Sequence, residues 1–175
     1  MPSIGDLIWV LASSYSSAAF GGGTGLTAAC DMAIAADSAT FALSEVRLGL
    51  IPATIGPYVA DAIGWRQARR YFLSAERIDA ALARQLGLVH DISPAEQLDA
   101  RIGKLVQELC KGAPAAQAEA KLLLADLRAG SPLDDALLEK TAWHIARVRS
   151  QPEAREGLSA FLDKRPPGWL PAKKP

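Results

Sequence analysis

FGGGTGLTAACD, residues 20–31, places three consecutive glycines directly before an apolar helical segment. An apolar run rich in β-formers, residues 7–15, precedes the glycines and predicts a strand. Where a strand ends and a helix begins, the first backbone N–H groups of the helix have no partner within it, and glycine lets a ligand atom approach them. Such a turn can bind a phosphate or a developing oxyanion. The alternative is a tight turn that only packs the helix against the strand.

The spacing of the glycines argues against a nucleotide-binding loop. Residues 21–26 have the sequence GGGTGL, which lacks the lysine of a GxxxxGK[ST] loop and does not match GxGxxG. No acidic residue follows about 20 positions later after a second strand, as a dinucleotide fold requires. The nucleotide-binding fingerprint at this turn is therefore weak, and the tight turn that only packs the helix stays open as the alternative.

Composition and charge exclude several classes of partner. The 175 residues carry 19 basic and 19 acidic side chains, and no Lys or Arg occurs before Arg47. A balanced charge favours neither nucleic acid nor an anionic membrane surface. The first six residues lack the basic start of a secretory signal, and the apolar run after them is too short to span a bilayer. We expect a soluble, cytoplasmic chain with no nucleic-acid or membrane partner.

Hydrophobic periodicity divides the chain into a strand-rich part, residues 1–92, and a helical part, residues 93–175. Asp79 is a candidate N-cap, and Ser93, with Pro94 next and Glu96 in capping-box position, predicts the start of another helix. Gly64 and Gly130 are expected to end helices. Strands are predicted at 7–15, 32–36, 40–43 and 88–92. Helices are predicted at 24–30, 53–63, 65–73, 78–88, 93–112, 114–129, 132–149 and 152–163.

Glu45 is a single carboxylate in the otherwise apolar segment SATFALSEVRLGLIPATIGPYV, residues 38–59. Burial would disfavour its charged form and suit it to moving protons at neutral pH. A surface glutamate paired with Arg47 is the alternative from the residues alone. His90 and His144 lie far apart without ligand partners at metal-binding spacing, so no metal site is predicted.

Three separated blocks, in order, resemble the enoyl-CoA hydratase/isomerase family, the crotonases. They are the glycine block with SEVRLGLIP (44–52), GWRQARRYFLSAERIDAALARQLGLV (64–89) and QPEAREGLSAFLDKRPPGW (151–169). Residues 39–59 are closer to the methylglutaconyl-CoA hydratase-like branch. The resemblance implies an α/β fold with a core of repeated strand-strand-helix turns. A C-terminal helical region that forms trimers or dimers of trimers would follow.

The resemblance also assigns site residues. Gly22 matches the backbone N–H donor of an oxyanion hole for the thioester of an acyl-CoA, with Gly21, Gly23, Gly25 and Pro52 as substrate contacts. Glu45 matches a catalytic acid/base, whereas Gly25 stands where the family usually has a second carboxylate. Lys164 and Arg165 are candidate contacts to the CoA phosphates. The family uses no metal or organic cofactor, because CoA is part of the substrate.

The resemblance implies a lyase that adds water to a 2-enoyl-CoA, with a branched, methylglutaconyl-like acyl group as one option. An enoyl-CoA isomerase that uses Glu45 alone is a second reading. The family's N-terminal part, which supplies the other oxyanion donor, has no counterpart before the glycines, and losing one donor costs about 3 kcal/mol. A third reading is therefore a truncated, feeble or inactive module that mainly self-associates.

Overall fold

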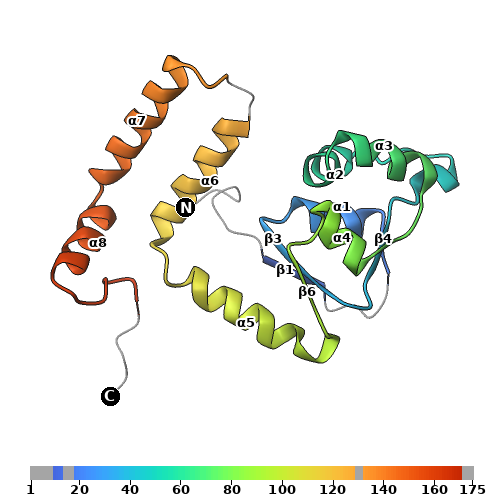
Figure 1. Cartoon of the computed structure of the whole chain (residues 1–175), viewed down its shortest axis with the longest axis horizontal. Helices are drawn as coiled ribbons and strands as arrows, with labels where there is room; N and C mark the ends of the chain where they lie inside the picture. Colours follow the sequence, from blue (N-terminus) through green and yellow to red (C-terminus); the bar gives the residue numbers. More distant parts are fainter. Residues whose placement is uncertain (1–9, 14–17, 129–131, 171–175) are drawn as a thin grey trace. The chain divides into compact units, whose positions relative to one another are not determined.

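The computed structural model describes residues 10–13, 18–128 and 132–170, and the chain divides into two compact units (Figure 1). Among the described residues, one unit ends at Leu105 and the other begins at Val106. The sequence places a boundary at 92/93. The first unit continues to Leu105 because Leu98 is buried with Ile34 and Ala36.

Two three-stranded sheets form the framework of the first unit, in the orders β1-β3-β6 and β2-β4-β5. All pairs are parallel except β4 with β5. The first two turns of the chain each give one strand to each sheet and then a helix, which is the strand-strand-helix repeat that the family resemblance implies, whereas in the third turn a helix separates the two strands. The strands are β1 (Val10–Ser13), β2 (Ala19–Phe20), β3 (Met32–Ala36), β4 (Thr40–Ala42), β5 (Ile78–Asp79) and β6 (Asp91–Ser93). The two-residue strands β2 and β5 were not predicted, because two residues carry no periodic signal.

Helices pack on these sheets around one apolar core that includes Phe41, Leu43, Val59 and Ile78. The helices are α1 (Gly22–Ala29), α2 (Gly56–Ile63), α3 (Trp65–Ser74) and α4 (Ala80–Leu86), and a 3-10 turn, η2, spans Glu45–Leu48. Asp79 caps α4 as predicted, since its Oδ1 accepts the Leu82 N–H at 2.8 Å. These elements position the glycine turn and Glu45 within one unit.

The predicted helix start at Ser93 is wrong. Ser93 is the last residue of β6, where it pairs with Ala36 of β3, and its hydroxyl donates to the carbonyl of Pro94 at 3.3 Å. A 3-10 turn, η3, follows at Ala95–Gln97, and α5 runs Leu98–Leu109. Sheet pairing holds Ser93 extended, and this tertiary contact overrides the local capping signal.

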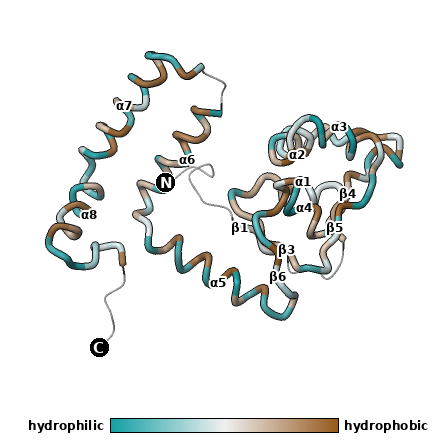
Figure 2. The backbone as a smooth tube through the Cα atoms, viewed as in Figure 1, coloured by the Kyte–Doolittle hydropathy of each residue, from teal (hydrophilic) through white to brown (hydrophobic). Residues whose placement is uncertain are grey.

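Three helices make up the described part of the second unit: α6 (Pro114–Arg128), α7 (Asp135–Arg149) and α8 (Pro152–Leu162). They match the predicted helices within three residues, while Gly130 lies outside the described residues. Helix α7 begins later than predicted because Asp134 caps it, accepting the Leu137 N–H at 2.9 Å. Neither α6 nor α7 contains a buried residue. Apolar residues recur along both helices between polar ones (Figure 2).

Within the described ranges, every helix is too short or too polar to span a bilayer.

Candidate active site

The glycine turn opens helix α1. Gly21 has φ 51°, in the left-handed region, and its N–H donates to the carbonyl of Ala42 in β4 at 2.9 Å. The Gly25 N–H donates to the Gly21 carbonyl at 3.1 Å and closes the first turn. Helix α1 therefore starts at Gly22, two residues before the predicted start. Gly22 and Gly23 are exposed, and at the start of a helix their N–H groups have no acceptor within it.

Thr24 anchors this helix to both strands beneath it. Its fully buried hydroxyl lies 2.7 Å from the carbonyl oxygen of Ala19 in β2 and 3.1 Å from that of Ala42 in β4. Ala42 also accepts the Gly21 N–H. This role cannot be predicted from the sequence, because a threonine within an apolar helix carries no signal for a contact 18 residues away. Thr24 fixes where the N–H groups of Gly22 and Gly23 point.

Glu45 faces the glycine turn. A Cβ added to Gly21 would lie 3.2 Å from Glu45 Oε1, so the carboxylate occupies the space beside that glycine. Its other oxygen, Oε2, is buried and has no hydrogen-bond partner among the described residues. Ion pairing with Arg47, the alternative that the residues left open, is not found in this part of the chain. The site thus contains a carboxylate oxygen that is sheltered from solvent and has no hydrogen-bond partner within the described residues.

Gly25 and Pro52, predicted as substrate contacts, are both buried. A Cβ on Gly25 would come within 2.1 Å of Ile55 Cγ2, so Ile55 fills the space that a side chain there would need. The Pro52 carbonyl accepts the Gly56 N–H at 2.7 Å and turns the chain into α2. Both residues have a packing role in the structure, and their contact with substrate stays a prediction.

Phe20 and Arg77 flank the turn and were not singled out from the sequence. The Arg77 guanidinium lies 5.6 Å from the centroid of the Phe20 ring, and Phe20 is immediately before Gly21. This cation–π contact joins residues 57 positions apart, which no local pattern could reveal.

Lys164 and Arg165, the predicted CoA phosphate contacts, belong to the other compact unit. Arg165 donates through two nitrogens to Glu156, at 2.7 and 2.9 Å, and Lys164 has a left-handed φ of 52° after α8. A phosphate bound to Arg165 would have to share or replace the Glu156 carboxylate. Their contact with CoA stays a prediction.

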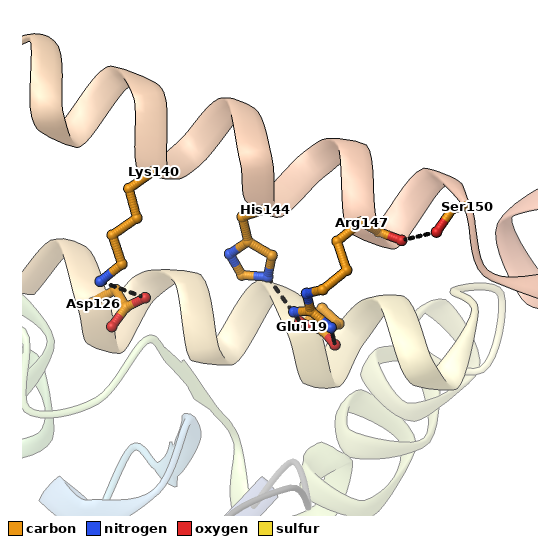
Figure 3. A network of polar contacts seen from close by, with 6 residues as sticks. All are labelled: Glu119, Asp126, Lys140, His144, Arg147 and Ser150. Carbon is orange, nitrogen blue, oxygen red and sulfur yellow. Dashed lines mark hydrogen bonds and ion pairs between the residues drawn. The ribbon is translucent and has the colours of Figure 1, made fainter.

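The polar cluster between α6 and α7 is internally paired (Figure 3). Glu119 accepts from Arg147 at 2.9 Å and lies 2.7 Å from His144 Nε2, while Lys140 pairs with Asp126 at 3.1 Å. Hydrogen bonds from Arg147 and His144 hold the pKa of Glu119 below its ordinary value. These contacts join two antiparallel helices, so His144 has a structural partner.

His90 is also structural. Its ring Nδ1 accepts a hydrogen bond from the backbone N–H of Ala33 at 3.1 Å. The backbone N–H of His90 donates in turn to the Ala33 carbonyl at 2.8 Å. The described residues contain no group of three or more His, Cys, Asp or Glu side chains able to hold a metal ion.

Exposed N–H groups beside a sheltered carboxylate can perform two linked tasks. The N–H groups can stabilise negative charge that develops on a carbonyl oxygen, and the carboxylate can move a proton to or from a neighbouring carbon or water. On a two-sheet framework of strands and helices, such a pairing of groups is what the stabilisation of an enolate requires. The chain belongs to the enoyl-CoA hydratase/isomerase family, which it matches over residues 4–171.

Solved structures of this class share the fold. An enoyl-CoA hydratase from Shewanella pealeana is 48% identical with a TM-score of 0.83, covering 87% of this chain and 57% of that one. An enoyl-CoA hydratase/isomerase from Marinobacter aquaeolei is 39% identical with a TM-score of 0.85, covering 94% and 61%. These similarities confirm the crotonase fold predicted from the sequence.

Among curated relatives, the mitochondrial methylglutaconyl-CoA hydratase of Mus musculus is 34% identical over 161 residues, which is 86% of this chain and 49% of that protein. The chain spans 48–60% of the length of the first three curated relatives that it matches.

Proposed function

We propose that this chain carries the acid/base half of an enoyl-CoA hydratase site, which adds water to a 2-enoyl-CoA. The observation that supports this proposal is that Oε2 of Glu45 is buried and has no hydrogen-bond partner among the described residues. The other carboxylate oxygen, Oε1, lies against the glycine turn. A buried carboxylate oxygen without a partner is costly, and a bound water or substrate proton would satisfy it. Family membership supplies the chemical context.

The proposed reaction needs a single carboxylate. Glu45 accepts a proton from water as the water oxygen bonds to Cβ of the substrate, and the electron pair of the double bond moves toward the thioester carbonyl. The Gly22 N–H donates to the resulting enolate oxygen. The proton held by Glu45 then passes to Cα, the carbonyl reforms, and Glu45 returns to its starting state. The net change is the addition of one water.

Substituting Glu45 tests this assignment. Glu45→Gln keeps the shape of the side chain but cannot accept the proton, so kcat for 2-enoyl-CoA hydration should fall by about 10²–10⁴-fold. Product formation is followed by mass spectrometry as the gain of one water. Glu76→Gln is the matched control, because Glu76 pairs with Arg70 in the same unit and should leave kcat unchanged. Undiminished turnover by Glu45→Gln, or none by the wild-type chain, contradicts the proposal.

Double-bond isomerisation by Glu45 alone is a second candidate, which the packing at Gly25 favours. Gly25 lies where a second carboxylate would be expected, and Ile55 occupies that space. In this reaction Glu45 would carry a proton between Cα and Cγ with no change in mass. Solvent deuterium at Cα or Cγ without a gain of water distinguishes it from hydration.

For the acyl group, we propose a branched, methylglutaconyl-like chain, in line with the named mouse relative. Comparing kcat/KM for 3-methylglutaconyl-CoA and for a linear 2-enoyl-CoA tests this choice. Equal or lower kcat/KM for the branched thioester contradicts it.

The third reading, an incomplete module that acts mainly in self-association, predicts no turnover and stable assembly through the helical unit.

A further inference from the structure

Two side chains from one segment meet the glycine block. Residues 45–55 supply Glu45, which faces Gly21, and Ile55, which faces Gly25. Gly21 and Gly25 are themselves joined by the first hydrogen bond of α1, at 3.1 Å, so these contacts lie one helical turn apart. The segment that carries the carboxylate therefore contacts the start of α1 at two glycines four residues apart, the N-cap Gly21 and Gly25.

The contact at Gly25 is a tight notch. The position for a Cβ on Gly25 is 2.1 Å from Ile55 Cγ2 and 2.4 Å from Ile55 Cβ, distances at which a methyl group cannot fit. A β-branched side chain has little rotational freedom at χ1 with which to move away. Helices α1 and α2 can approach this closely only because position 25 has no side chain.

The contacts of helix α2 also hold Ile55 in place. It is the N-cap residue of α2, and its carbonyl accepts the Val59 N–H at 3.1 Å. A Cβ added to the next residue, Gly56, would lie 3.3 Å from the ring of Phe72 in α3. The start of α2 is thus held between α1 and α3, which confines the Ile55 side chain to the space beside Gly25.

From these contacts we propose that Ile55 is a positioning residue for Glu45. Its side chain, seated in the notch at Gly25, fixes residues 45–55 on α1 and thereby sets the carboxylate of Glu45 against Gly21. Interiors are close-packed, so a change in the notch shifts the segments that meet there. The catalytic consequence rests on the proposed function, whereas the placement of Glu45 does not.

A double-mutant cycle tests the coupling. Gly25→Ala introduces the clash and should lower kcat by about 10–100-fold with a smaller change in KM, because small displacements of reacting groups cost up to about 10²-fold. Ile55→Gly opens the notch and should lower kcat by a smaller factor. The double variant Gly25→Ala/Ile55→Gly should recover much of the loss caused by Gly25→Ala, since it lacks both Ile55 atoms, Cβ and Cγ2, that would clash with the new methyl group. Gly103→Ala, at a helical glycine with open space around it, is the matched control and should leave kcat unchanged.

A second readout keeps the placement of Glu45 testable without turnover. With ¹³C-labelled glutamate and ¹⁵N-labelled glycine, Ile55→Ala should shift the Glu45 carboxyl resonance and the amide resonances of Gly21 and Gly22, whereas Gly103→Ala should not. A purely structural Ile55 would lower the melting temperature and leave those resonances in place. Unmoved resonances, or no recovery of the folded fraction or kcat in the double variant, would overturn the inference. A wild-type chain without turnover but with these shifts would reject only the proposed function.

Discussion

Gly21 combines a conformational and a steric requirement for glycine. Its φ of 51° is a left-handed value that costs a residue with a Cβ about 1–2 kcal/mol. The position of that Cβ is also 3.2 Å from Glu45 Oε1. Backbone conformation and carboxylate placement therefore constrain the same residue.

Gly21→Ala should accordingly lower the free energy of unfolding by about 1–2 kcal/mol and displace the Glu45 carboxylate. Chemical denaturation measures the first effect, and kcat for acyl-CoA turnover measures the second. Gly22→Ala is the comparison for stability alone, because nothing lies within 4 Å of a Cβ there. Equal unfolding free energies for the two variants would contradict the steric account of Gly21.

At this scale the sequence predicts some contacts and not others. The run of glycines at a strand-to-helix junction and the single glutamate in an apolar segment are both local signals. The structure brings Gly21 and Glu45 together. The Ile55 notch at Gly25 and the Thr24 bonds to Ala19 and Ala42 depend on how helices and strands meet. Ile55 and Thr24 look like ordinary core residues until the fold places their partners beside them.

At the scale of elements, α1 depends on the buried hydroxyl of Thr24. Thr24→Val keeps the shape but removes the donor shared by two strand carbonyls, so the free energy of unfolding should fall by about 1–3 kcal/mol. Thr27→Val is the matched control on the same helix. The Thr27 hydroxyl is also buried, but it donates to Gly23 within α1 at 3.0 Å, where the carbonyl keeps its helical partner. Thermal or chemical denaturation should give a clearly lower free energy of unfolding for Thr24→Val than for Thr27→Val. The reverse order contradicts this role of Thr24.

The sequence predicts an element correctly where local residues determine its bounds. It predicts an element wrongly where pairing between distant strands determines them. The Asp79 cap and the long helices α6 and α8 follow from capping chemistry and periodicity. Ser93, Pro94 and Glu96 carry an equally good capping signal, yet β6 pairs with β3 through Ser93. A strand partner nearly 60 residues away cannot be seen in a local window.

The end of α8 carries a pH-dependent contact. Hydrogen bonds from Arg165 and from the Gly168 N–H lower the pKa of Glu156 to about 2 from its ordinary 4.5. A lowered pKa in the folded state stabilises the fold above the ordinary value, and this contribution is lost as pH falls through the folded value. We therefore expect the contact to persist at pH 4.5 and to break near pH 2.

Carboxyl ¹³C titration of Glu156 measures this directly. Arg165→Gln should move the midpoint toward the ordinary value, while Arg155→Gln, on the same helix, should leave it in place. A midpoint that Arg165→Gln does not raise contradicts the assigned cause. The exposed position of the pair limits its effect on global stability.

At the scale of the whole molecule, the helical unit exposes apolar surface that it does not bury itself. Trp143 is 70% exposed, Phe161 80% and Leu162 76%, while Ala160 is the one buried residue in α6, α7 and α8. Exposed apolar surface of this kind marks an interaction site. We propose a second copy of the chain as the occupant, in a trimer or dimer of trimers, as the family resemblance implies.

Phe161→Asp/Leu162→Asp should therefore shift the chain toward the monomer, because each charge would have to be desolvated in the interface. Sedimentation velocity over a range of concentrations measures the assembly state. Arg155→Glu is the control, since it changes charge on the exposed face of α8 without removing apolar surface, and it should assemble like the wild type. Circular dichroism establishes that the variant keeps its helices, so that loss of assembly is separated from loss of fold. A wild-type chain that sediments as a monomer at every concentration contradicts self-association, and an assembled double variant places the interface away from α8.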